Sequence, residues 1–141
     1  MSPSKVLAPS LLVGSAVLFS LGCSSMTSPT VNPPSGDVTI NKGASTLGTA
    51  AFTPNPFAVS VTGAKLGKVT WVNGDYTSTY NGTTGTTHHL VSDSLVSGSP
   101  LFDSGAMGAA KAYSFTFTGA GSIAYHCSIH PSMTGTITVT P

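Results

Sequence analysis

Near the end of the chain, a thiol, an imidazole and a thioether follow one another at a regular spacing. Cys127, His130 and Met133 form the pattern Cys-x-x-His-x-x-Met, between two segments with the residue types of strands. These soft and borderline donors suit copper better than magnesium, calcium or manganese, which prefer oxygen ligands. A trigonal copper site needs one more imidazole, and the neighbouring His88 and His89 offer it upstream. Two His, one Cys and a distant axial Met are the ligand set of a blue, or type 1, copper centre.

Two of these residues also have a simpler interpretation. A lone cysteine such as Cys127 is commonly a buried, inert thiol, and Met133 could fill a gap in a core. Met107 is a competing thioether, but its Gly-Ala-Met-Gly surroundings indicate a loop.

The alternation of strand side chains limits which histidines can face a metal. His126 adjoins Cys127 on a candidate strand, so its side chain should point to the opposite face. For the same reason only one of His88 and His89 can point at the site. The residue types alone leave open which of the two it is.

Charge is scarce in this chain of 141 residues, which has five Lys, four Asp, no Arg and no Glu. Without residues 1–22, which contain Lys5, four Lys balance four Asp. That balance argues against nucleic-acid binding, which needs a basic face. No Gly-rich phosphate loop or paired-carboxylate site is present. A disulfide between the only two cysteines, Cys23 and Cys127, is the simple alternative to a metal site, but neither cysteine has the surroundings typical of one.

Residues 1–22 have the layout of a bacterial export signal, with Lys5 before an apolar run and small residues after it. The run is shorter than the roughly 20 residues that span a bilayer. Its end, Ser20-Leu21-Gly22-Cys23, resembles the lipobox of bacterial lipoproteins, although that family usually has Leu where Ser20 stands. A lipid on Cys23 would anchor the protein to the membrane; plain secretion and an uncleaved anchor are the alternatives. We therefore expect an exported protein, in the periplasm or at the outer cell envelope.

Residues 23–36 are rich in Ser, Thr and Pro, which predicts an extended, disordered tether. Residues 37–141 form the predicted domain, in which short strand patterns alternate with Gly, Pro and Asn. Seven or eight strands at this spacing, without helical periodicity, predict an all-β, two-sheet sandwich with Greek-key connections. The predicted strands include 38–40, 57–61, 69–73, 112–118, 122–127 and 134–140.

From about Ala51 to Val139, the sequence resembles the cupredoxins, particularly the plastocyanin-like and amicyanin-like blue-copper proteins. The short gap between His130 and Met133 is similar to that of amicyanin. The segments that carry the resemblance are Val69–Asn73, His88–Asp93, Leu101–Gly105, Tyr113–Phe117 and the closing loop Tyr125–Gly135.

The resemblance implies which residues bind the metal. Its pattern places the ligand His five residues before the Asp of a Ser-Asp pair, here Asp93, which favours His88 over His89. The implied ligands of one copper ion are His88, Cys127, His130 and Met133. The polar stretch 74–87 looks longer than the matching cupredoxin turn; it is either a tolerated surface loop or a segment that shapes the surface near copper.

The resemblance also implies a function: a monomeric one-electron carrier that cycles between Cu(II) and Cu(I) at the bacterial cell envelope, and not an enzyme. His130 would be the electron exit, and Pro131 and its apolar neighbours would dock redox partner proteins through a weak, transient interface. The main alternative is a copper-binding or delivery protein without a redox role. A Cys127–His130 nucleophile–base pair and a zinc site are further alternatives; no oxyanion-hole motif accompanies the former.

Overall fold

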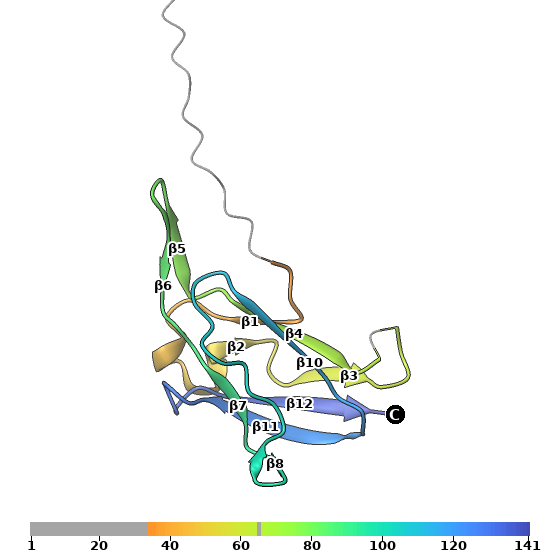
Figure 1. Ribbon diagram of the computed structural model, residues 1–141. Coiled ribbons are helices and arrows are strands. Elements are labelled where there is room, and N and C mark those ends of the chain that lie inside the picture. The colour runs from red at the N-terminus through yellow and green to blue at the C-terminus, as the bar shows by residue number, and fades with distance from the viewer. Residues whose placement is uncertain (1–33, 65) are drawn as a thin grey trace, which may run out of the picture.

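The computed structural model describes residues 34–64 and 66–141 (Figure 1). The predicted export signal, Cys23 and most of the predicted tether lie outside the described residues. The boundaries 1–22, 23–36 and 37–141 therefore stay predictions. Among the described residues, no helix has the length and apolar character needed to span a membrane.

Two four-stranded sheets pack against each other in the described part of the chain. The first sheet contains, in spatial order, β10 (Ala112–Thr116), β4 (Lys68–Asn73), β1 (Val38–Ile40) and β2 (Phe52–Thr53). The second contains β3 (Phe57–Ser60), β12 (Thr134–Thr140), β11 (Gly121–Cys127) and β7 (Leu90–Ser92). The chain crosses between the sheets several times, and the pairs β1–β4 and β3–β12 are parallel. The predicted all-β Greek-key sandwich is thus confirmed.

The core lies between the two sheets and follows the alternation in the sequence. In β12, Ile137 and Val139 are buried between more exposed threonines, as the pattern predicts. Trp71 of β4 and Tyr125 of β11 are almost completely buried and meet edge to face, with ring centroids 5.7 Å apart. The loop residue Phe102 packs against both rings. This aromatic cluster joins the two sheets, and its Tyr125 lies two residues before Cys127 on β11.

Most of the strands predicted from the sequence are present, with ends that differ by no more than two residues. The shorter elements were not predicted. They are the 3-10 helices η1 (Ala44–Thr46) and η2 (Gly48–Ala51), strands β2 and β7, and the hairpins of β5 (Tyr76–Thr79) with β6 (Gly82–Gly85) and of β8 (Leu95–Val96) with β9 (Ser99–Pro100).

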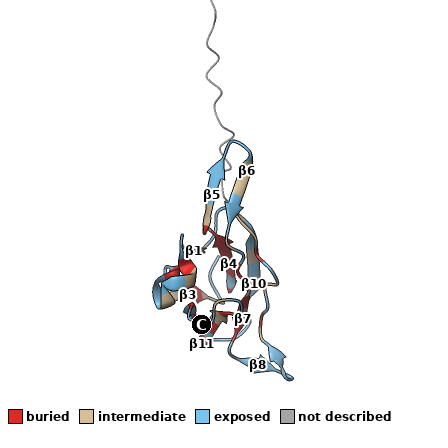
Figure 2. Ribbon diagram, turned by 90° about the vertical axis from the view of Figure 1, so that its left-hand side faces the viewer, coloured by how far each residue is buried: buried red, intermediate tan, exposed pale blue. Residues whose placement is uncertain are grey.

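The polar stretch 74–87 is mostly a β-hairpin and not an irregular loop. Strands β5 and β6 pair antiparallel from Tyr76↔Gly85 to Thr79↔Gly82. Gly82 has a φ of 120°, which a residue with a side chain rarely adopts, and it closes the turn. The hairpin projects from the sandwich (Figure 1) and is largely exposed (Figure 2). Its second strand leads directly to His88.

The close approach of Tyr125 to Gly135 gives a test of the packing. The two residues are paired across β11 and β12, and a Cβ at Gly135 would overlap the ring and hydroxyl of Tyr125. We expect Gly135→Ala to lower the free energy of unfolding by about 1–3 kcal/mol, because overpacking forces the ring to move. Gly121→Ala in β11 is the control, since a Cβ there meets nothing within 4 Å. Equal denaturation midpoints for the two variants would contradict this packing.

Candidate metal centre

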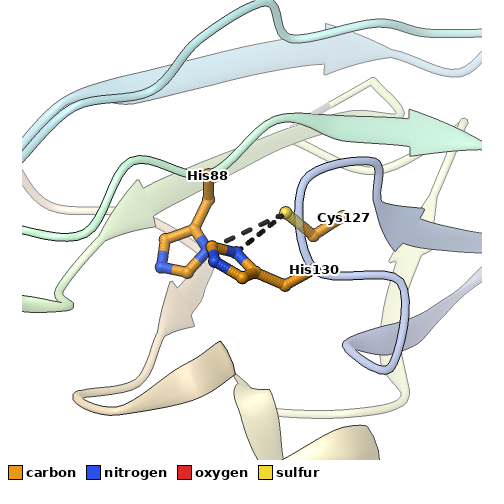
Figure 3. A group of neighbouring side chains, drawn as sticks. All are labelled: His88, Cys127 and His130. Atoms are coloured by element: carbon orange, nitrogen blue, oxygen red, sulfur yellow. Dashed lines mark hydrogen bonds between the residues drawn. The ribbon is translucent and has the colours of Figure 1, made fainter. Parts of the chain in front are cut away.

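Three segments bring the candidate ligands together. Cys127 is the last residue of β11, and His130 lies in the loop that returns the chain to β12. His88 lies two residues before β7, whose Leu90 pairs with Cys127 across the sheet. Figure 3 shows both imidazole rings directed toward the Cys127 sulfur, with His88 approaching from a different segment. The packed sandwich therefore fixes the distance between His88 and the Cys127–His130 loop.

The donor atoms are spaced for a single metal ion. The Nδ1 atoms of His88 and His130 each lie 3.8 Å from Cys127 Sγ, and the three donor atoms are all within 4.8 Å of one another. Bonds of about 2.3 Å to sulfur and about 2.0 Å to nitrogen, as zinc makes, would separate these atoms by roughly 3.7 Å in a trigonal plane. Both sulfur–nitrogen distances match that separation, so the thiol and the two rings are placed to share one ion.

Backbone hydrogen bonds hold the thiol in place. The His89 N–H points at Cys127 Sγ, with a nitrogen–sulfur distance of 3.4 Å. The Cys127 N–H donates to the Met133 carbonyl at 3.1 Å, and the Met133 N–H donates to the His130 carbonyl at 3.0 Å. These bonds close the loop on itself. A rigid loop suits a site that must change oxidation state with little rearrangement.

The electrostatics of the site favour a thiolate. Burial raises the pKa of Cys127, but its hydrogen bonds, first with His88 and then with the backbone of His89 and His130, outweigh burial and lower the pKa to about 6. Burial lowers the pKa of His88, but contact with Cys127 and Asp75 raises it above its usual value. The thiolate is the form of cysteine that binds a metal. Cys127 is also buried, and it forms no disulfide within residues 34–64 and 66–141.

The two histidines outside the cluster point away from it, as strand alternation predicts. His89 turns outward and hydrogen-bonds to Asp103 on the surface. His126 contacts Asp93 through Nδ1 at 2.6 Å, and this pair is also partly exposed. Of the neighbouring pair His88 and His89, the structure therefore brings His88, and not His89, to Cys127.

Both candidate thioethers are buried. Met133 is fully inaccessible and lies at the end of the ligand loop. Met107 lies in a loop, as its sequence predicts, yet only 2% of its surface is exposed. Its backbone forms an isolated antiparallel bridge with His88, which puts both side chains on the same face. Met107 is therefore a second thioether near the site, and it needs a direct test against Met133.

Asp75 is a residue of this site that the sequence did not single out. Its Oδ2 lies 3.0 Å from His88 Nε2, whereas Cys127 lies beside the other ring nitrogen. Burial raises the pKa of Asp75, but hydrogen bonds from Gly43 and His88 hold it below the usual value. The sequence signal was weak: a single acidic residue after β4, within a stretch that looked like a surface loop.

Comparison with solved structures places this fold among known proteins. No family model matches the sequence, and no match was found among curated proteins. A purple cupredoxin from Nitrosopumilus maritimus is 26% identical, with a TM-score of 0.56 over 75% of this chain and 100% of that one. An oxidized mutant of amicyanin is 25% identical, with a TM-score of 0.52 over 80% of this chain and 89% of that one. A copper-containing nitrite reductase from Thermus scotoductus is 29% identical over 64% of this chain but only 20% of its own, with a TM-score of 0.48.

The resemblance to the cupredoxins is therefore confirmed. The chain has their two-sheet fold, and its His88, Cys127 and His130 cluster fits a type 1 copper site. Met133, at the end of the same loop, completes an arrangement like that of such a site. Copper is thus the cofactor that the fold and the donor set support.

The choice between the adjacent histidines can be tested by substitution. A thiolate bound to Cu(II) in a type 1 site would give the chain an intense visible absorption band. We expect His88→Ala to abolish this band, because it removes a nitrogen 3.8 Å from Cys127 Sγ. His89→Ala should keep that absorption, since only its backbone N–H approaches the sulfur. The visible spectrum, with copper content measured in parallel, checks both. Bleaching by His89→Ala and not by His88→Ala would reverse the assignment.

Proposed function

We propose that this protein is a one-electron carrier with a type 1 copper centre held by His88, Cys127, His130 and Met133. The observation that carries the proposal is the placement of two imidazole nitrogens at 3.8 Å from one buried thiol. Copper held there would supply one-electron chemistry by alternating between Cu(II) and Cu(I). The cupredoxin fold of the chain supports this function over hydrolytic chemistry, for which the sequence offers no oxyanion-hole motif.

The candidate ligands differ in how far they are exposed to solvent. Cys127 and His88 are fully buried, which excludes water from one side of the ligand cluster. His130 is partly exposed and is flanked by the exposed residues Ile129 and Pro131. The His130 ring therefore links the cluster to the surface, and it is the proposed exit for the electron.

The surface around His130 suits brief encounters with a redox partner. The neighbouring Ile129 is 50% exposed there. With four Lys against four Asp after residue 22, no strong field steers a charged partner. We propose a small, weak interface with the protein acting as a monomer, and complex formation that depends little on salt.

The proposed place of action is the bacterial cell envelope. The export-signal pattern in residues 1–22 and the tether in residues 23–36 support it. A lipid on Cys23 would hold the domain at a membrane and let the tether set its reach. The export signal, Cys23 and most of the tether lie outside the described residues, so this location rests on the sequence.

The central experiment is the visible spectrum of the copper-loaded chain. We expect an intense thiolate-to-Cu(II) band, lost in Cys127→Ser and on reduction to Cu(I), and regained on reoxidation. Rapid electron self-exchange and slow loss of Cu(I) to a chelator should accompany it. A colourless Cu(II) complex would refute the type 1 site. A coloured protein that surrenders Cu(I) readily and exchanges electrons slowly would instead be a copper-delivery protein.

The two buried thioethers can be told apart with matched variants. Met133→Leu should shift the visible band and raise the reduction potential, because a weak thioether ligand would help to set both. Met107→Leu makes the same chemical change beside His88 and should leave the spectrum and the potential nearly unchanged. Spectroscopy and redox titration of both variants provide the measurement. The opposite pattern would make Met107, and not Met133, the thioether ligand.

A further inference from the structure

The Asp75–His88 contact is the buried member of three histidine–aspartate contacts. The side chains of His88 and Asp75 are 0% and 8% exposed. The His89–Asp103 and His126–Asp93 pairs are far more exposed, with side-chain values between 31% and 52%. A buried carboxylate must be well satisfied by hydrogen bonds to remain charged. Asp75 meets that condition.

Each oxygen of the Asp75 carboxylate has its own donor. Oδ1 accepts from the Gly43 N–H at 2.8 Å, and Oδ2 accepts from His88 Nε2 at 3.0 Å. Gly43 has a φ of 72°, a left-handed conformation that glycine adopts without strain. The turn after β1 thus directs an N–H at the carboxylate and keeps it from rotating away from His88.

The backbone of Asp75 is fixed as firmly as its side chain. Its N–H donates to Asn73 Oδ1 at 2.9 Å, and its carbonyl accepts from the Thr86 N–H at 3.0 Å. The amide of Asn73 in turn donates to the Thr86 and Met107 carbonyls, both at 2.8 Å. These bonds close the base of the β5–β6 hairpin around the carboxylate.

The geometry determines which nitrogen of His88 carries the proton. An ionised carboxylate can only accept hydrogen bonds, so the Nε2 beside Asp75 must carry hydrogen. In the neutral ring, Nδ1 then holds the free electron pair, and Nδ1 is the atom that faces Cys127 Sγ. The carboxylate therefore prepares the ring for metal binding on the correct side.

We propose that Asp75 is a positioning residue of the copper centre, which fixes the Nε2–H form of His88 and strengthens Nδ1 as a donor. This inference rests on the proposed function. A carboxylate on the second nitrogen raises the basicity of a ligand histidine. A stronger nitrogen donor stabilises Cu(II) more than Cu(I), so Asp75 lowers the reduction potential. Changes at such supporting residues typically alter metal affinity by about 10- to 100-fold.

Asp75→Asn tests this role of the carboxylate directly, because the amide side chain has nearly the same shape as the carboxylate but carries no charge. An amide has one oxygen and cannot accept from both Gly43 and His88 as the carboxylate does, so it either offers its NH₂ group to Nε2 or loses the Gly43 bond. We expect the potential to rise; a tenfold loss of Cu(II) affinity relative to Cu(I) corresponds to about 59 mV for one electron. Asp93→Asn is the control, since it makes the same change on the exposed His126 and should leave the potential unchanged.

A second measurement does not depend on the variant or on copper. In the metal-free protein, at a pH where His88 is neutral, ¹⁵N NMR of the imidazole nitrogens should show the proton on Nε2. A proton on Nδ1 would overturn the inference, even if Asp75→Asn fails to fold. So would equal potentials for wild type and Asp75→Asn in a chain that binds copper with the expected blue colour. A colourless copper-loaded wild type would instead refute the proposed function. The tautomer of His88 is measured without copper, so that result would not be affected.

Discussion

The pairing of β7 with β11 is the constraint on which the candidate metal centre depends. It sets Leu90 opposite Cys127 and so carries the segment before β7 past the end of β11. His88 reaches the thiol only because of this register. A shift of one residue would turn His88 outward and bring His89 in, since strand side chains alternate. The buried rings of Trp71 and Tyr125 hold the two sheets together beside this pair. The packing of the core therefore also sets the geometry of the candidate metal centre.

Much of this arrangement follows from the sequence, because its signals are local. The Cys-x-x-His-x-x-Met spacing confines three donors to one short loop, whatever the rest of the chain does. Strand alternation separates His126 from Cys127, and His89 from His88, by the same simple rule. The alternating β10 and β12 patterns predict both the strands and their more buried faces, and the structure agrees.

What the sequence could not provide depends on contacts between distant segments. Asp75 looked like one acidic residue at the start of a polar loop. Its burial arises only when the β5–β6 hairpin closes and the turn at Gly43 packs beside it. The burial of Met107 likewise follows from its bridge to His88, in a distant part of the chain. Residue types and spacing do not encode such pairings, so local patterns identified the donors and missed the groups that support them.

The distribution of charge explains how a nearly neutral protein can tune a metal centre. Three of its four Asp contact three of its four His. Two of these pairs lie on the surface, where water and salt weaken their effect. Of the three, only Asp75 acts in a buried setting, where a carboxylate perturbs its partner strongly. The other candidate ligand histidine, His130, is partly exposed on the loop. In the proposed centre, Asp75 would fix and tune the ring of His88, while the ring of His130 would connect the site to the surface, so the two tasks would fall on different residues.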